Sequence, residues 1–112
     1  MKTAYINGTI YTGEERLIGK AVITESGIIS DIIDADAVDK NYQLFDLKGS
    51  NLAPAFIDMQ IYGGNGKMFS HDLSIESLKA TYEYCLSGGA SHFMITMATN
   101  SIEIFLKGIE VV

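Results

Sequence analysis

The sequence contains a single cysteine, a single proline and no long run of apolar residues. One cysteine excludes an internal disulfide, which is typical of proteins kept in a reducing cytoplasm. No stretch is long and apolar enough to predict a membrane span, and no charged and then apolar leader follows Met1. From these absences we expect a cytoplasmic protein that does not use a membrane as its partner.

Basic residues are also scarce. Lysine and arginine total 8 against 14 acidic residues, so the formal net charge is −6. This balance excludes nucleic acid and anionic membranes as general partners, because both require a basic surface. It does not exclude a small phosphorylated ligand held by a few local groups. The 112 residues are 47% hydrophobic and 20% charged, which is enough for a modest core.

Residues 1–53 consist of short β-rich segments separated by turn residues, and we expect them to form part of a small β-sandwich or an open sheet. The predicted strands are 4–6, 9–11, 21–24, 28–33 and 42–47. The dipeptide Asn7-Gly8 takes positive φ at low cost, which predicts a two-residue hairpin between the first two strands. Residues 25–27 predict a second hairpin. Residues 12–16 predict a polar turn, and the acidic stretch 34–40 a solvated link.

The pattern changes at Pro54, and residues 54–112 alternate between strand and helix. An apolar run from Phe56 to Ile61 stops at a glycine-rich loop, which predicts a strand buried on both faces. Ser74 is placed to cap a helix, and residues 93–97 predict a second strand. Residues 99–101 then open a second helix, with a capping box predicted between Asn100 and Glu103. This order is typical of βα units in a parallel sheet.

The two helices differ in how they end. The first helix is predicted to end at Gly88-Gly89. Its apolar residues recur at helical spacing: Ile75, Leu78, Tyr82, Cys85 and Leu86. We interpret Cys85 as a buried core thiol. The second helix has an apolar face but no closing glycine and no basic last turn. We therefore expect the chain to be the leading piece of a larger protein.

Candidate functional residues are those at the carboxyl ends of the two predicted strands, where βα folds place their sites. For the first strand these are Gln60, Tyr62, Gly63, Gly64 and Asn65, and for the second Thr96, Thr99 and Asn100.

Each of these residues also has a structural interpretation. Asp58 and Gln60 alternate with apolar residues, so we expect their side chains to share one face. For Asp58 an internal hydrogen bond is favoured, whereas Gln60 is either a buried, satisfied amide or a site residue. The 63–66 loop is predicted as a tight βα turn rather than a phosphate cradle, because Lys67-Met68 replaces the Lys-Ser/Thr of a P-loop. His71 and His92 have no ligand spacing and are interpreted as structural or surface residues.

The segment Pro-Ala-Phe-Ile-Asp-Met-Gln-Ile-Tyr-Gly-Gly, residues 54–64, resembles the first barrel strand of the amidohydrolase superfamily. That family has the pattern Pro-Gly-Phe-Ile-Asp-x-His-x-His-Gly, with both histidines as metal ligands. Here Gln60 and Tyr62 take their places, and Gln at the first position is characteristic of the N-acetylglucosamine-6-phosphate deacetylases. Residues 88–97 resemble that family's second barrel strand. Tyr62 departs from this branch, which often has Asn there.

The resemblance implies a fold, a reaction and a cofactor. It implies that residues 54–112 are the first two βα units of a TIM (β/α)8 barrel, cut short. It implies a hydrolase that converts N-acetylglucosamine 6-phosphate to glucosamine 6-phosphate and acetate, as a homodimer. The cofactor would be a divalent metal ion, zinc or iron, held by later strands. No catalytic residue or metal ligand of the family falls within this chain, so we expect the segment alone to be inactive.

Two other functions stay open at this point. One is a different amidohydrolase, which full His-x-His ligation would have favoured. The other is a non-catalytic module that binds a ligand or partner. A cut barrel should expose apolar surface and aggregate, whereas an independent module should be monodisperse.

Overall fold

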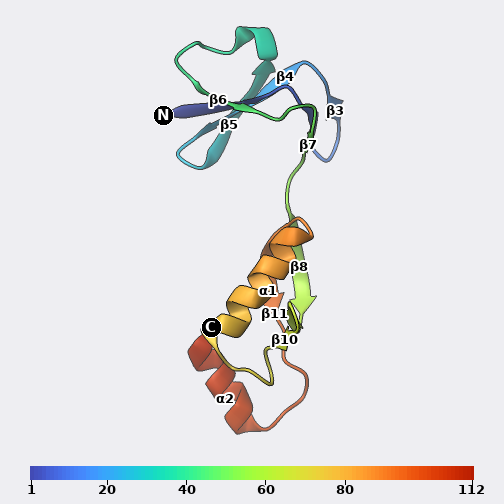
Figure 1. Cartoon of the computed structure of the whole chain (residues 1–112), viewed down its shortest axis with the longest axis vertical. Helices are drawn as coiled ribbons and strands as arrows, with labels where there is room; N and C mark the ends of the chain where they lie inside the picture. The colour runs from blue at the N-terminus through green and yellow to red at the C-terminus, as the bar shows by residue number, and fades with distance from the viewer. The chain divides into compact units, whose positions relative to one another are not determined.

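The computed structural model describes residues 1–112. The chain forms two compact units, Met1–Pro54 and Ala55–Val112. The first unit holds two sheets of mixed strand direction (Figure 1). The four-stranded sheet has the order β5-β4-β1-β6, and the three-stranded sheet the order β3-β2-β7. The strands are β1 (Lys2–Ile6), β2 (Thr9–Tyr11), β3 (Arg16–Leu17), β4 (Lys20–Glu25), β5 (Ile28–Asp34), β6 (Gln43–Asp46) and β7 (Asn51–Leu52). A short 3-10 helix, η1 (Ala35–Ala37), lies in the predicted acidic link.

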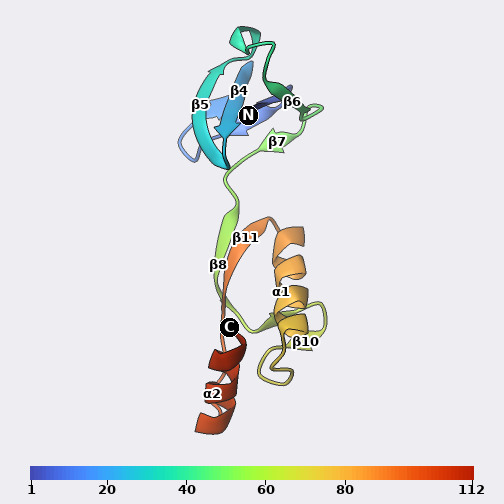
Figure 2. The ribbon, with the colours of Figure 1, turned by 90° about the vertical axis from the view of Figure 1, so that its left-hand side faces the viewer.

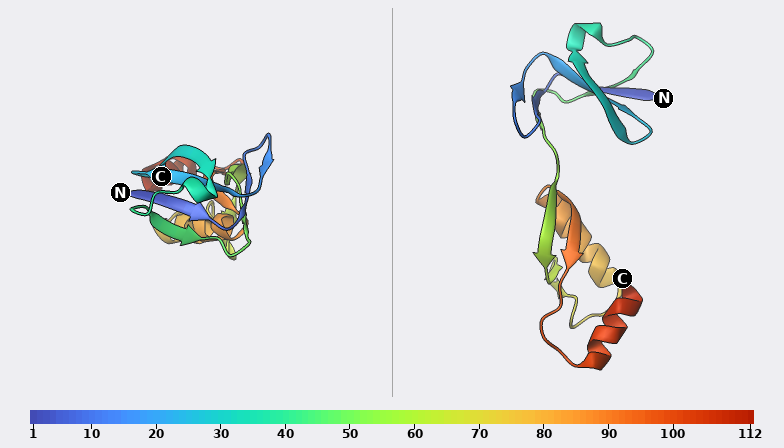
Figure 3. Two further views of the ribbon diagram at one scale, coloured as in Figure 1. Left: turned by 90° about the horizontal axis from the view of Figure 1, so that it is seen from above. Right: turned by 180° about the vertical axis from the view of Figure 1, so that it is seen from behind.

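The hairpin predicted around residues 25–27 is confirmed. Strands β4 and β5 are antiparallel, and Glu25 pairs with Ile28, so Ser26 and Gly27 alone form the turn. Both take positive φ, at 52° and 79°, which is the backbone shape that matches the twist of the two strands. Figure 3 shows this hairpin from two further sides.

The hairpin predicted at Asn7-Gly8 is wrong. Strand β1 pairs antiparallel with β4 and parallel with β6, whereas β2 pairs with β3 and β7 in the other sheet. Asn7 has a φ of 58°, but Gly8 is not left-handed, so the dipeptide turns the chain from one sheet into the next. A Cβ on Gly8 would lie 2.7 Å from the carbonyl oxygen of Ser50, which shows that this glycine permits close backbone approach.

The core of the first unit is small. Ala4, Ala21 and Ile23 are almost fully buried where β1 and β4 meet. Partly buried hydrophobic residues pack against them: Ile6, Ile33, Val38 and Tyr42. Alanine side chains are small, so Ile23 provides most of the side-chain volume among these three buried residues.

The second unit contains a parallel strand pair connected by a helix, as predicted. Strand β8 (Phe56–Ile61) pairs parallel with β11 (Ala90–Ile95), and α1 (Ile75–Ser87) connects them, as Figure 2 shows. Between β8 and α1 lies a small hairpin of β9 (Gly63–Gly64) and β10 (Lys67–Met68). The second helix, α2 (Ile102–Val111), follows β11. Strand β11 starts three residues earlier than predicted, because Gly89 at φ 84° turns the chain directly into it.

The expectation that the first strand is buried on both faces is wrong for this chain. Phe56, Ile57 and Met59 are 61% to 71% exposed. Strand β8 has only one neighbour, β11, so neither its free edge nor its second face is covered. The apolar run alone cannot show which neighbours are present.

The buried face of α1 also differs from the predicted one. Ser74 caps the helix as expected, with its Oγ accepting the Ser77 N–H at 3.1 Å. The buried residues, however, are Ser77, Thr81 and Cys85, whereas Tyr82 and Leu86 are exposed. Small residues are favoured there because the helix packs closely on the β9 backbone: a Cβ on Gly64 would lie 3.0 Å from the Thr81 Cα. The prediction of a buried Cys85 is confirmed.

Helix α2 begins one residue later than the predicted capping box requires. Its N-cap is Ser101, whose Oγ accepts the Ile104 N–H at 3.4 Å. The Asn100 Oδ1 instead accepts the Ser101 N–H, so the box with Glu103 does not form. Gly108 is buried where the helix meets Met97 and Phe69. Neither α1 nor α2 has the length and apolar character needed to span a bilayer.

Candidate functional site at the carboxyl end of β8

Gln60 and Tyr62 lie at the carboxyl end of β8 and contact each other. The Gln60 Nε2 donates to the Tyr62 hydroxyl oxygen at 3.0 Å, and both side chains are exposed. The backbone N–H of Gln60 donates to the Asp58 Oδ1, also at 3.0 Å. The hydrogen bond predicted for Asp58 is therefore present, but it is local and solvent-accessible rather than internal.

A β-bulge interrupts β8 at these residues. Asp58 pairs with Phe93 and Ile61 with Ile95, so Met59 and Gln60 together stand opposite the single residue Met94. The predicted alternation, which put Asp58 and Gln60 on one face, rested on a regular strand and does not apply across this bulge. Bulges re-aim side chains and are enriched beside active sites. Nothing in the local sequence indicates where a bulge will form.

The glycine-rich loop 63–66 is a β-hairpin turn, so the predicted βα turn is wrong. Asn65 and Gly66 take φ values of 49° and 77° and connect β9 to β10. The Asn65 Nδ2 donates to the Ala80 carbonyl oxygen of α1 at 3.2 Å. The Asn65 side chain therefore connects the hairpin to α1 by a hydrogen bond and has a structural role.

A second contact links strand β10 to the loop before α1. The Lys67 Nζ lies 2.7 Å from the Asp72 Oδ2. The hydrogen bond from Lys67, and a weaker one from Ser74, lower the pKa of Asp72. The pair is solvent-accessible, so it orders the loop before α1 without contributing much stability.

Two of the three residues predicted at the end of β11, Thr96 and Asn100, have structural partners. The backbone N–H of Thr96 donates to the Ile61 carbonyl oxygen at 2.7 Å, which brings the ends of β8 and β11 together. The Thr96 Oγ1 makes only a long contact, 3.4 Å, to the Met94 carbonyl oxygen, and Asn100 caps Ser101. Thr99 is exposed. Of the two histidines, His92 contacts Ser91 through its Nδ1, and His71 makes a backbone turn to Met68.

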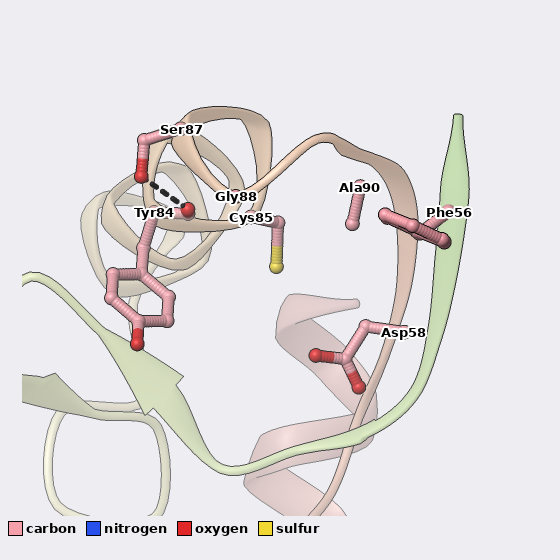
Figure 4. Close-up of a pocket in the computed structure, with 7 residues that line it drawn as sticks. All are labelled: Phe56, Asp58, Tyr84, Cys85, Ser87, Gly88 and Ala90. Atoms are coloured by element: carbon pink, nitrogen blue, oxygen red, sulfur yellow. Dashed lines mark hydrogen bonds between the residues drawn. The ribbon is translucent and has the colours of Figure 1, made fainter. Parts of the chain in front are cut away.

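A cavity of about 420 Å³, which the sequence did not indicate, lies at the opposite ends of the strands. Figure 4 shows the Asp58 carboxylate and the Cys85 thiol pointing into it from β8 and α1. Burial, and to a lesser degree the charge of Asp58, raises the pKa of the Cys85 thiol. Phe56 and Ala90, the first residues of their strands, also line this cavity, whereas Gln60 and Tyr62 do not.

The residues of this chain do not fit a divalent metal ion. No group of three or more His, Cys, Asp or Glu side chains converges on one point. At the end of β8 the ligands on offer are a neutral amide and a phenol that must lose a proton to bind well. What Gln60 and Tyr62 can supply is neutral hydrogen bonding: an amide carbonyl that accepts, and a phenol O–H that donates.

The sequence of this chain is similar to one family of known proteins. Residues 4–52 match the NagA composite domain. The chain is 37% identical over 99 residues to the N-acetylglucosamine-6-phosphate deacetylase of Haemophilus influenzae, covering 88% of this chain and 26% of that protein.

Solved structures agree with this comparison. The crystal structure of N-acetylglucosamine-6-phosphate deacetylase from Pasteurella multocida matches 99% of this chain with a TM-score of 0.92 and 34% identity, and 29% of that protein is covered. A mutant N-acetyl-D-glucosamine-6-phosphate deacetylase from Mycobacterium smegmatis, at 18% identity and a TM-score of 0.68, shares the fold.

The chain thus spans between a quarter and a third of the length of the proteins it matches. By sequence and by fold it corresponds to the N-terminal segment of the N-acetylglucosamine-6-phosphate deacetylase family.

Proposed function

We propose that the protein containing this segment hydrolyses N-acetylglucosamine 6-phosphate. Water would add to the acetamide carbonyl carbon, the C–N bond would break, and the products would be glucosamine 6-phosphate and acetate. The observation that carries the proposal is the 37% identity to the Haemophilus influenzae deacetylase, which extends over 88% of this chain. The net charge of −6 of this segment does not argue against a phosphorylated substrate, because a few local groups can bind a phosphate.

The proposal assigns the two units different parts of the larger fold. Residues 1–53 would belong to a β-sandwich, and residues 54–112 would be the first two βα units of a TIM barrel. The parallel β8-α1-β11 unit supports the second assignment, because such a barrel is a ring of these units. The exposed face and free edge of β8 would then be covered by further strands.

A divalent metal ion, zinc or iron, forms part of the proposal. When bound, such an ion lowers the pKa of water and polarises a carbonyl group. Because this chain offers no ligand set, the ligands would lie in the rest of the protein, and the segment alone would be inactive. Gln60 and Tyr62 would contact the substrate or the reacting water by hydrogen bonds, beside Gly63 and Gly64. We also propose that the protein is cytoplasmic, because a single cysteine fits a reducing compartment, and that it is a homodimer, on family resemblance alone.

The proposal is tested by expressing the complete reading frame that contains these residues. Purified protein should release acetate from N-acetylglucosamine 6-phosphate, lose this activity on treatment with a chelator and regain it with zinc or iron. Residues 1–112 expressed alone form the matched control and should release none. A complete protein that binds the sugar phosphate without releasing acetate would refute the deacetylase and favour a binding module. Acetate release from the segment alone would contradict the assignment of catalysis to other residues.

A further inference from the structure

The end of β8 holds Gln60 at two points. Its backbone N–H is bound by the Asp58 carboxylate and its side-chain amide by the Tyr62 hydroxyl, each at 3.0 Å. The β-bulge at Met59 and Gln60 sets the position from which the side chain leaves the strand. An exposed glutamine ordinarily samples many rotamers, and ordering it costs conformational entropy. The Tyr62 contact therefore restrains the Gln60 side chain, and the Asp58 contact restrains the backbone that carries it.

The side-chain contact decides where the Gln60 amide lies. In a planar amide the oxygen lies on the other side of the carbonyl carbon from the nitrogen. When Nε2 donates to Tyr62, Oε1 is therefore turned away from Tyr62 and left free to accept. The Tyr62 hydroxyl can donate as well as accept, so it fixes the place of the amide and not which of its two ends faces the ring. Without the phenol oxygen the Gln60 side chain would be free to leave this position. In either orientation one end of the amide contacts Tyr62 and the other is free to hydrogen-bond a ligand.

We propose that Tyr62 is a positioning residue that holds the Gln60 amide at the carboxyl end of β8, so that the free end of the amide can hydrogen-bond the bound amino sugar. The inference rests on the proposed function for the identity of the ligand, but the contact itself does not. Tyr62 acts through Gln60, so its effect should disappear when Gln60 is removed. A structural role for Tyr62 would instead persist in that background.

The test is a double-mutant cycle in the complete protein, with Tyr62→Phe, Gln60→Ala and the double variant. Tyr62→Phe keeps the ring and removes only the oxygen. Loss of one hydrogen bond should lower kcat/KM about threefold to tenfold. In the Gln60→Ala background the same change should have no further effect. Tyr82→Phe is the matched control, because Tyr82 on α1 is 43% exposed against 41% for Tyr62, and it should leave kcat/KM unchanged.

A second readout does not depend on activity. With ¹⁵N-labelled glutamine, the side-chain amide signal of Gln60, assigned as the one lost in Gln60→Ala, should shift in Tyr62→Phe and stay in place in Tyr82→Phe. An unchanged signal in Tyr62→Phe would overturn the proposal, as would an equal loss of kcat/KM in both backgrounds. If the complete protein has no deacetylase activity, the proposed function fails separately. The amide signal then still decides whether Tyr62 positions Gln60.

Discussion

Substitution of Gly64 by alanine should loosen the contact between the β9–β10 hairpin and α1. Gly64 is buried, and an added Cβ would lie 2.6 Å from the Tyr84 Cβ and 3.0 Å from the Thr81 Cα. Both atoms belong to the helix close to its backbone, so they cannot move away as the far end of a long side chain would. Overpacking of this kind costs about 1 to 3 kcal/mol. The helix must therefore shift away from the hairpin or open more often.

Cys85 provides the assay, because it is the only cysteine of the chain and is buried on the same face of α1 as Thr81. Cys85 is only 3% exposed although its thiol faces the cavity, so a thiol reagent should label it mainly when the helix opens. The labelling rate under native conditions then reports the free energy of opening. A loss of about 1 to 3 kcal/mol raises the rate about 5- to 150-fold.

Gly66→Asn is the matched control in the same hairpin. Nothing lies within 4 Å of its added Cβ, and asparagine tolerates the φ of 77° there. This variant should change the labelling rate by less than about threefold. Equal rates for Gly64→Ala and the unmodified chain would refute the close packing of β9 on α1.

Three further predictions concern local stability. Ser74→Ala removes the N-cap of α1 and should cost about 1 kcal/mol, seen as about fivefold faster labelling of Cys85; an unchanged rate would show that the cap carries no stability. Ile23→Ala should cost about 2 to 4 kcal/mol, measured by amide hydrogen exchange of β4, whereas Ile28→Ala, at a side chain 70% exposed, should cost about 0.5 kcal/mol or less. Burial raises the pKa of Cys85 above its ordinary value of 9.0, so the unfolded thiol ionises first, and stability should fall as pH rises past that value. Cys85→Ala should remove this fall in the free energy of unfolding, measured by urea unfolding at neutral and at alkaline pH. An identical pH dependence in both proteins would exclude the thiol as its source.

The sequence by itself determined the features that depend on neighbouring residues. The cap at Ser74, the end of α1 at Gly88-Gly89 and the hairpin turn at Ser26-Gly27 each form between groups a few positions apart. Their hydrogen bonds are set by local chemistry, so residue type and spacing are sufficient to predict them. The resemblance carried by residues 54–64 likewise needed only the order of the residues.

The tertiary structure decided what depends on distant partners. Asn7-Gly8 and Asn65-Gly66 are the same dipeptide, yet only the second forms a hairpin, because β1 finds its partners in β4 and β6. The buried face of α1 followed from close packing on Gly64 rather than from its largest apolar residues. The bulge in β8 arises from its pairing with β11. It interrupts the alternation of side chains between the two faces of the strand after Asp58, and so sets the position of Gln60. Strand pairing and close packing join residues that are far apart in the chain, so a local sequence pattern cannot predict these contacts.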